Sequence, residues 1–446
     1  MKVPNFLILL AIVVSLSITM VAKSEAQERV RSLAQIANSN LKFIANSQVK
    51  RPDGIYVAGE WRAQIYASLF PIIIGVGNPF DSDEEPSAFT TGSIMNQLAL
   101  IYRDHPEFQQ IPPMLVKALP SIERFREGDL YNFYPPRIWR GVRVHQTASM
   151  MLAPHWKGFT NVPEDADTTA VSYTARFYSE KVLKGKKLNL PPGTLKSYSR
   201  FRDLKREPHS INLEMRMVNT GAFLTWQYDE NDPRRPKEFF AEPEEGKRIP
   251  FKTNDVDCIV NLNVLRLLSL TDHSNIKGRA QSCALMGYIV QSENYAKCGL
   301  YYPNTYNFHY SAALVDEAGE SCMRPYGEQM VGYILKTLAA DGGWYNLDNN
   351  QIGDRTHASA YALYALARFG APGDSRVRRA LADGSRFLLS RILRSQGGHL
   401  YWQGETFFTA NGLGRALGSV DWKSDAFTTS IALGALLQAD RALATP

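Results

Sequence analysis

Apolar residues recur along the chain with helical spacing, in six pairs of runs that a glycine and a group of aromatic residues separate. The first run of each pair is amphipathic and covers residues 30–48, 113–126, 211–219, 278–293, 326–339 or 376–395. The second is apolar, rich in small residues, and covers residues 87–102, 166–178, 256–268, 308–318, 355–370 or 425–439. The glycines between them are Gly54, Gly128, Gly221, Gly299, Gly342 and Gly398. Six such units predict an all-α fold of about twelve helices, an (α/α)6 toroid whose second helices form the inner ring.

The predicted toroid covers residues 27–446 as a single domain, because a targeting signal occupies the first 26 residues. Lys2 precedes an apolar stretch at 6–22, and small residues stand at Ser24 and Ala26, as in cleaved signal peptides. An uncleaved anchor is the alternative, although the stretch falls short of the roughly 20 residues of a membrane span. We therefore predict a secreted or periplasmic protein. Two polar stretches, about 179–210 and 227–253, are predicted to be loop insertions.

The net charge and the cysteine content limit the kinds of binding partner and of disulfide that the chain can have. The 50 basic and 44 acidic residues leave a formal net charge of +6, which does not indicate a nucleic-acid partner. The basic residues between 181 and 206 are typical of a solvated segment, with peripheral membrane contact as the alternative. Four cysteines, at positions 258, 283, 298 and 322, permit disulfides in an exported chain. Three pairings are possible, and neither the pairing nor the oligomeric state follows from the sequence.

Carboxylates gather at the starts of two of the second helices. Asp165 and Asp167 open the run at 166–178, where Asp167 is predicted to be the helix N-cap, and Asp255 and Asp257 open the next unit. One cap needs one carboxylate, so one carboxylate of each pair is in excess. Two acids at one level repel each other unless a proton, a cation or a substrate intervenes. These four residues are the candidate catalytic residues.

The chain contains Ala-Asp-Gly-Gly-Trp at 340–344, the other glycine–aromatic turns, and PEDADTTAVSYTARFY at 163–178. In these stretches it resembles the α/α toroid of terpenoid cyclases and protein prenyltransferases, the squalene-hopene-cyclase-like superfamily. As architecture, the resemblance covers essentially the whole mature chain. Polyprene-cyclising members use Asp-x-Asp-Asp, whose middle Asp protonates an alkene. Residues 165–168 and 255–258 each match three of these four positions, with Thr168 and Cys258 in place of the last Asp. The resemblance implies that Asp167 is the proton donor, that Asp165 tunes it, and that Asp255 and Asp257 lie opposite.

Aromatic residues cluster at the turns, at the same level as the acids. Their faces can stabilise a carbocation, stack on sugar rings, or simply pack between helices. The predicted substrate-binding residues are Trp61, Trp139, Trp226, Phe308, Tyr310, Trp344, Trp402 and Glu405.

The leading interpretation is an exported, cyclase-like enzyme that acts on an isoprenoid or other apolar substrate and needs no cofactor. A carbohydrate-active α/α-barrel enzyme, with a carboxylate pair drawn from Asp83, Asp167, Asp257 and Glu405, is an alternative. A second alternative is a non-catalytic toroid that binds a lipid or a protein. The prenyltransferase branch of the resemblance would imply zinc, for which the ligands on offer are Asp257, Cys258, His309 and His357.

Overall fold

The computed structural model describes residues 33–67, 82–147, 161–229, 242–249, 253–346, 355–411 and 419–445. The predicted signal peptide lies outside these residues, and so do residues 230–241 and 250–252 of the second predicted insertion. Within the described residues, no helix combines the length and the apolar character that crossing a membrane requires.

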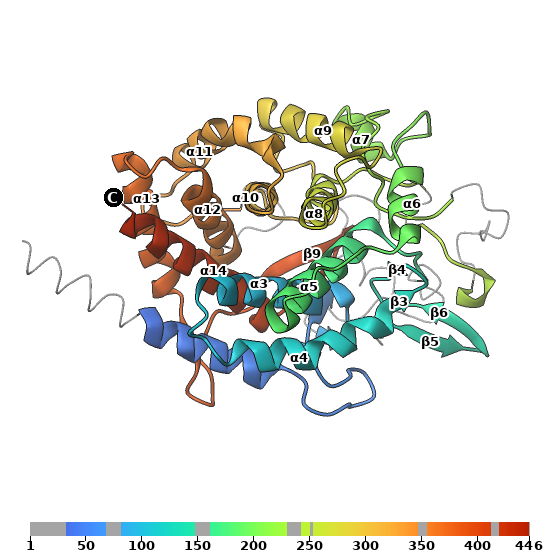
Figure 1. The fold of residues 1–446 in the computed structure, drawn as a ribbon, viewed down its shortest axis with the longest axis horizontal. Coiled ribbons are helices and arrows are strands. Elements are labelled where there is room, and N and C mark those ends of the chain that lie inside the picture. The colour runs from blue at the N-terminus through green and yellow to red at the C-terminus, as the bar shows by residue number, and fades with distance from the viewer. Residues whose placement is uncertain are drawn as a thin grey trace, which may run out of the picture.

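Six helices correspond to the predicted second runs: α3 (Ala88–Asp104), α5 (Ala166–Lys184), α8 (Cys258–Leu270), α10 (Asn307–Glu317), α12 (Arg355–Phe369) and α14 (Asp425–Ala444). Each packs against the next in this order, and α14 packs against α3, so that the contacts close into a cycle (Figure 1). Small residues permit this close packing. A Cβ atom at Gly92 of α3 would lie only 3.0 Å from Cγ1 of Val171 on α5.

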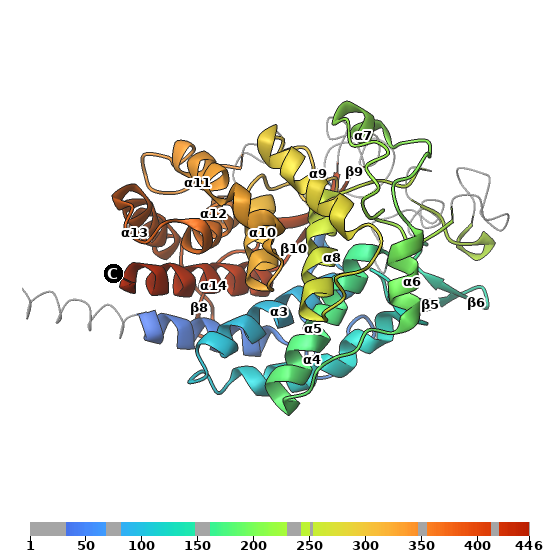
Figure 2. The ribbon, with the colours of Figure 1, turned by 45° about the horizontal axis from the view of Figure 1, so that its top comes forward.

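A second set of helices packs outside the first. It comprises residues 33–47, α4 (Ile111–Ile122), α9 (Arg279–Gln291), α11 (Gly327–Lys336) and α13 (Ser375–Ser390). The α4 helix packs on α3 and α5, α9 on α8, α11 on α12, and α13 on α12 and α14. Figure 2 shows α9, α11 and α13 on the outer side of α8, α10 and α12.

The third unit differs from its prediction. The run expected at 211–219 contains only the five-residue helix α7 (Ser210–Glu214), and the stretch expected to be a loop at 179–210 is partly helical. There α5 continues to Lys184, and α6 spans Pro192–Arg200. The α6 helix buries Thr194, Ser197 and Tyr198, so its inward face is polar and gives no apolar periodicity.

The described residues are mostly helical, as predicted, and they also contain short strands that the prediction did not include. A four-stranded antiparallel sheet has the order β2-β1-β10-β9, from β2 (Ser82–Glu84), β1 (Gln64–Ala67), β10 (Ser419–Lys423) and β9 (Thr406–Asn411). Three two-stranded hairpins accompany it: β3 (Arg126–Glu127) with β4 (Leu130–Tyr131), β5 (Pro136–Trp139) with β6 (Val142–His145), and β7 (Leu393–Arg394) with β8 (Leu400–Tyr401). The sheet joins strands more than 340 positions apart along the chain, a pairing that no local pattern reveals.

Three tryptophans of the glycine–aromatic turns tie the outer helices to the inner ones. Trp61, Trp344 and Trp402 have no exposed surface, and each indole N–H donates to a carbonyl near the end of the preceding outer helix, at 2.8 Å. Those carbonyls belong to Ile44, Ile334 and Leu388. The backbone N–H of each tryptophan donates to a hydroxyl of the following inner helix, from Thr91, Ser359 and Thr429. The turn is therefore a repeated structural joint.

An ion-pair network closes the end of the ring where the inner helices finish. Its members come from the C-terminal ends of α3, α10, α12 and α14, which shows that these ends meet. Arg103 pairs with both Asp104 and Glu317, Arg368 with Asp316, and Arg441 with Asp104. We refer to these six residues as the C-terminal ion-pair network.

Candidate active site

The helix α5 begins at Ala166, so its N-cap lies two residues before the predicted cap, Asp167. Asp165 is the N-cap, with an extended φ of −123°, and its carboxylate accepts the backbone N–H of Thr168 at 2.5 Å. The backbone N–H of Ala166 already donates to the carbonyl of Thr225 at 2.7 Å, which fixes the start of the helix. The prediction that Asp167 is the N-cap is therefore wrong. Asp167 stands in the first turn, where its side chain is not needed as a cap.

Asp167 is held by two side chains from other elements. Its Oδ1 accepts the amide N–H of Asn263 on α8 at 2.7 Å, and its Oδ2 accepts the hydroxyl of Tyr302. Burial raises the pKa of Asp167 to about 6, against the opposing effect of the hydrogen bonds from Tyr302 and Asn263. The carboxyl therefore keeps its proton well above the usual range of an aspartic acid.

In the second acid pair, too, one carboxylate caps a helix and the other does not. Asp257 is the N-cap of α8: its Oδ1 accepts the N–H groups of Ile259 and Val260, at 2.7 and 3.1 Å. Its Oδ2 accepts the N–H of Leu300 at 2.5 Å, and burial raises its pKa to about 7. The carboxylate of Asp255 accepts the side-chain hydroxyls of Thr225 and Tyr301. Burial raises its pKa as well. Each pair thus contains one cap and one carboxyl that capping does not use.

Two consecutive tyrosines connect the pairs. Tyr301 donates its hydroxyl to Asp255 at 2.7 Å and its backbone N–H to Asp257, and Tyr302 donates its hydroxyl to Asp167. The indole of Trp226 donates to the Tyr301 hydroxyl at 3.0 Å, which brings this predicted residue into the site. Tyr302 and Asn263 were absent from the predicted set. A polar residue such as Asn263 within the apolar run 256–268 was the available signal.

Aromatic rings surround this acid network at the N-terminal ends of the inner helices. Phe408 of β9 lies at the centre, with ring centroids 4.9 Å from Phe133, 5.1 Å from Trp422, 5.7 Å from Tyr301 and 5.9 Å from Tyr302. Together with Phe89, Phe407 and Phe427, these residues form what we call the aromatic cluster. Because Tyr302 belongs to the cluster and its hydroxyl bonds Asp167, one hydrogen bond connects the acid to the aromatic cluster.

The other predicted substrate-binding residues are divided among several places. The turn tryptophans Trp61, Trp344 and Trp402 are structural joints, as described above. Glu405 accepts the N–H groups of Thr356 and His357, so it caps the start of α12 from another segment. Phe308 has no exposed surface, and Trp139 lies on the β5–β6 hairpin. Tyr310 faces the inner helices and donates its hydroxyl to Gln97 at 3.1 Å.

The side chains considered for zinc do not form a zinc site. Cys258 is bonded to Cys298 and Cys283 to Cys322, so neither Asp257 nor the histidines have a thiolate beside them. His309 stacks on Tyr333, and burial lowers its pKa to about 3. His357 shares a hydrogen bond with Thr428. Among the described residues, the group with metal-ligand spacing is Cys283, Glu320 and Cys322, whose sulfurs form a disulfide.

One face of each of the inner helices α5 and α8 carries residues that keep a small accessible surface. On α5, Asp167, Val171 and Tyr178 keep 4, 5 and 5% of their surface, with spacings that place them on one side of a helix. On α8, Arg266 keeps 5%, and Asn263 is only half-buried. Neighbours with no exposed surface include Ala170, Ser172, Tyr173, Leu262 and Leu265. Since Asn263 bonds Asp167, the two faces point toward the same interior.

No protein-family model matches the chain, and no curated protein has a significantly similar sequence. Solved structures do match in fold. A variant of the type II terpene cyclase MstE from Scytonema, in complex with its substrate geranylgeranyl dihydroxybenzoate, has a TM-score of 0.58 and 15% identity, covering 93% of this chain and 99% of that one. The apo form of MstE has a TM-score of 0.54 and 14% identity over the same shares. The chain therefore has the fold of type II terpene cyclases.

Proposed function

We propose that this protein is a terpenoid-cyclase-like enzyme in which the carboxylic acid of Asp167 starts the reaction of an isoprenoid or another apolar substrate. One observation carries the proposal. Asp167 is a buried carboxyl that capping does not use, its pKa is raised to about 6, and it adjoins the aromatic cluster through Tyr302. An acid that must protonate a weak base such as an alkene needs this combination of a retained proton and apolar surroundings.

The proposed reaction begins when Asp167 transfers its proton to a terminal carbon–carbon double bond of the substrate. The electron pair of that bond takes the proton, and a carbocation forms at the neighbouring carbon. A further double bond of the same substrate attacks this cation, which forms a carbon–carbon bond and closes a ring. Loss of a proton from the cyclised cation ends the reaction, so the product is an isomer of the substrate. The π faces of Phe89, Phe408 and Tyr302 would stabilise the cation.

The other three acids would support Asp167. Burial and the charge of Asp167 raise the pKa of Asp165 well above its ordinary value, so Asp165 would stay neutral beside an ionised Asp167. Asp255 and Asp257, whose pKa values burial also raises, lie across the tyrosine pair. They would keep the far side of the site from accumulating negative charge.

The apolar class of substrate is supported by burial and by the neighbour in fold. Asp165, Asp167, Asp255 and Asp257 keep 5, 4, 1 and 0% of their surface, whereas paired carboxyls of a polysaccharide-cleaving groove must meet a hydrated polymer. MstE, which has the same fold, binds an isoprenoid substrate. We also propose that the six units form the (α/α)6 toroid expected from the repeats, with the substrate held along its axis.

We further propose that the enzyme acts outside the cytosol. Two disulfides, Cys258–Cys298 and Cys283–Cys322, support this, because such bonds persist in oxidising compartments. Fractionation of the producing cells tests the proposal. Recovery of the full-length chain, residue 1 included, from the cytosol would contradict it.

The test of the enzyme proposal is to incubate the purified protein with a panel of isoprenoids in D2O and to analyse products by gas chromatography and mass spectrometry. We expect a cyclised isomer that carries one deuterium from the initiating acid. Asp167→Asn should abolish it. Glu164→Gln is the matched control, because Glu164 is a neighbouring acid that pairs with Lys247 and does not touch Asp167. Cyclised product from folded Asp167→Asn protein would refute the assignment.

A further inference from the structure

A buried arginine lies deeper in the ring than the acids. Arg266 stands on α8 three residues after Asn263, so the two side chains share a face and lie roughly 4.5 Å apart along the helix axis. Its guanidinium carbon lies 5.4 Å from the ring centroid of Tyr178, eleven residues beyond Asp167 on α5. Arg266 therefore occupies the same interior as Asp167, farther toward the C-terminal ends of the helices.

The guanidinium of Arg266 has unused donors. Within the described part of the chain, its Nε and Nη2 atoms are buried and donate to no acceptor, and no carboxylate forms an ion pair with it. Its polar neighbours are the tyrosines Tyr178, Tyr310 and Tyr364, whose hydroxyls supply no formal charge. A buried cation with two idle N–H groups is costly unless something else supplies acceptor oxygens.

A second polar group in the same region is also incompletely satisfied. Gln97 of α3 bonds the Tyr310 hydroxyl through one atom of its amide, and the other amide atom has no partner among the described residues. This remains true whichever way the amide is turned. Tyr310 thus lies beside two groups that each keep at least one unpaired polar atom among the described residues, and the inner helices α3, α8 and α10 contribute to the arrangement.

From this geometry we infer that Arg266, with Tyr310 and Gln97 beside it, binds an anionic head group, a carboxylate or a phosphate, at the end of the substrate opposite to the reacting double bond. The inference rests on the proposed function, since it assigns the orientation of the same substrate. The anionic oxygens accept the idle N–H groups of Arg266, and the apolar chain runs back along the faces of α5 and α8. The terminal double bond then lies near Asp167.

The other arginines at this end of the inner helices, which belong to the C-terminal ion-pair network, are less suited than Arg266 to bind an anionic head group. Arg103, Arg368 and Arg441 lie beyond it at the end of the ring, and each already has a carboxylate partner. Arg266 is the inner-helix arginine nearest the acid layer that has no ion pair among the described residues.

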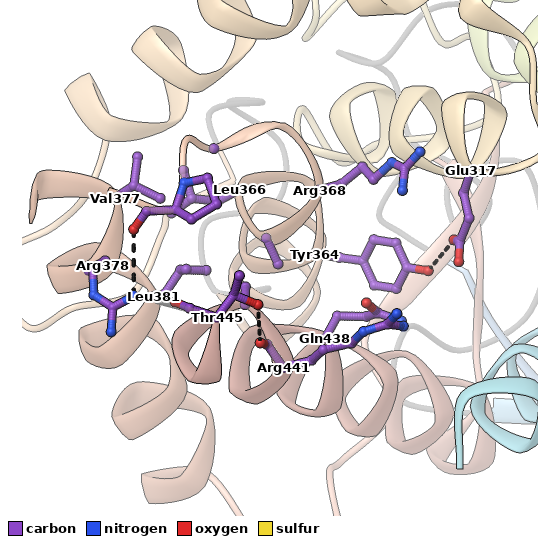
Figure 3. A pocket seen from close by; sticks show the side chains of 14 residues that line it. Glu317, Tyr364, Leu366, Arg368, Val377, Arg378, Leu381, Gln438, Arg441 and Thr445 are labelled. Carbon is purple, nitrogen blue, oxygen red and sulfur yellow. Dashed lines mark hydrogen bonds between the residues drawn. The ribbon is translucent and has the colours of Figure 1, made fainter. Parts of the chain in front are cut away.

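A cavity lined by arginines serves as the rival site in the test. The cavity of about 330 Å3 lies between α12, α13 and α14 and is lined by Arg368, Arg378 and Arg441 (Figure 3). Its arginines have partners: Arg378 donates to the carbonyls of Leu443 and Thr445, at 2.9 and 3.0 Å. An anion bound there would respond to changes at Arg441, not at Arg266.

The experiment measures binding in the full-length Asp167→Asn protein, which cannot turn over its ligand. Isothermal titration calorimetry compares geranylgeranoic acid, geranylgeranyl diphosphate and the neutral geranylgeraniol. We expect at least one of the two anionic probes to bind ten times more tightly than the alcohol, and which one does so separates carboxylate from phosphate recognition. Adding Arg266→Met should remove this preference, Arg266→Lys should keep part of it, and Arg441→Met should leave it unchanged.

Each other outcome is decisive. A preference that survives Arg266→Met, or that disappears with Arg441→Met, overturns the assignment. Equal binding of all three probes, with Arg266→Met changing only the melting temperature measured by circular dichroism, shows that Arg266 is structural, while the proposed function stands. If none of the probes binds and the unsubstituted protein yields no cyclised product, both proposals fall together.

Discussion

The replacement of Asp167 by Asn is expected to stabilise the protein at alkaline pH while it removes activity. Burial raises the pKa of this carboxyl from 3.8 to about 6 in the folded chain. Between those two values the folded protein holds a proton that the unfolded chain has lost, so stability falls as the pH rises through this window. At about 1.4 kcal/mol for each pKa unit, the shift destabilises the ionised folded state by about 3 kcal/mol above pH 6.

Asparagine has nearly the same shape and carries no charge, so it escapes this penalty. Tyr302 can still donate to its carbonyl oxygen, and Asn263 can turn its amide to accept from the new N–H group. We therefore expect Asp167→Asn to raise the free energy of unfolding by about 3 kcal/mol at pH 8 and to leave it nearly unchanged below pH 4. Relief of the neighbouring Asp165, whose pKa Asp167 helps to raise, acts in the same direction.

Urea unfolding, followed by circular dichroism at pH 4 and pH 8 with the disulfides intact, measures both values. Glu164→Gln serves as the control for loss of a carboxylate in the same segment, since this residue is already compensated by Lys247. Equal destabilisation of Asp167→Asn at both pH values would refute the reasoning. It would mean that Asp167 is a charged structural residue in the folded protein.

Three further outcomes follow from the same contacts. Tyr302→Phe removes a hydrogen bond that favours the ionised form of Asp167, so the pH above which kcat declines should move upward by about one unit, and an unchanged profile would contradict the contact. Trp344→Phe should lower the free energy of unfolding by about 1–3 kcal/mol without altering KM, and a raised KM would restore its predicted role in substrate binding. Replacing Cys258 and Cys298 together by Ala should reduce the free energy of unfolding, measured in urea, by about 2–4 kcal/mol, because their disulfide closes a loop with a sequence separation of 40. An equal free energy of unfolding with and without reductant would show that the bond is absent.

The sequence was most informative where one local pattern repeats. The inner helices appear at the predicted places because small and apolar residues continue around their circumference, and the glycine–aromatic turns mark the boundaries. Excess charge was equally informative. Since one carboxylate suffices as a cap, each pair indicated one carboxyl with another purpose. The sequence assigned the cap of its helix to Asp167, and only the contacts show that Asp167 and Asp255 are the two carboxyls that capping does not use.

Other features could not be derived because their determinants lie far apart along the chain. The cap of α5 passed to Asp165 because Thr225, nearly sixty residues later, accepts the N–H that fixes the helix start. The burial of Trp61, Trp344 and Trp402 depends on carbonyls of other helices, which composition does not show. Tyr302 is one tyrosine of several at its turn, and only the three-dimensional path of residues 299–302 directs it to Asp167.

The joining of the two ends of the chain has a consequence for the order of assembly. The hydroxyl of Ser424 donates to the carbonyl of Arg62, Asn40 donates to the carbonyl of Leu400, and β10 pairs with β1. None of these contacts can form until nearly all residues have left the ribosome, and contacts between such distant segments slow folding. Until α14 arrives, the sides of α3 and α12 that it covers remain open to water. The closure of the ring of inner helices therefore comes late relative to synthesis, because it depends on α14.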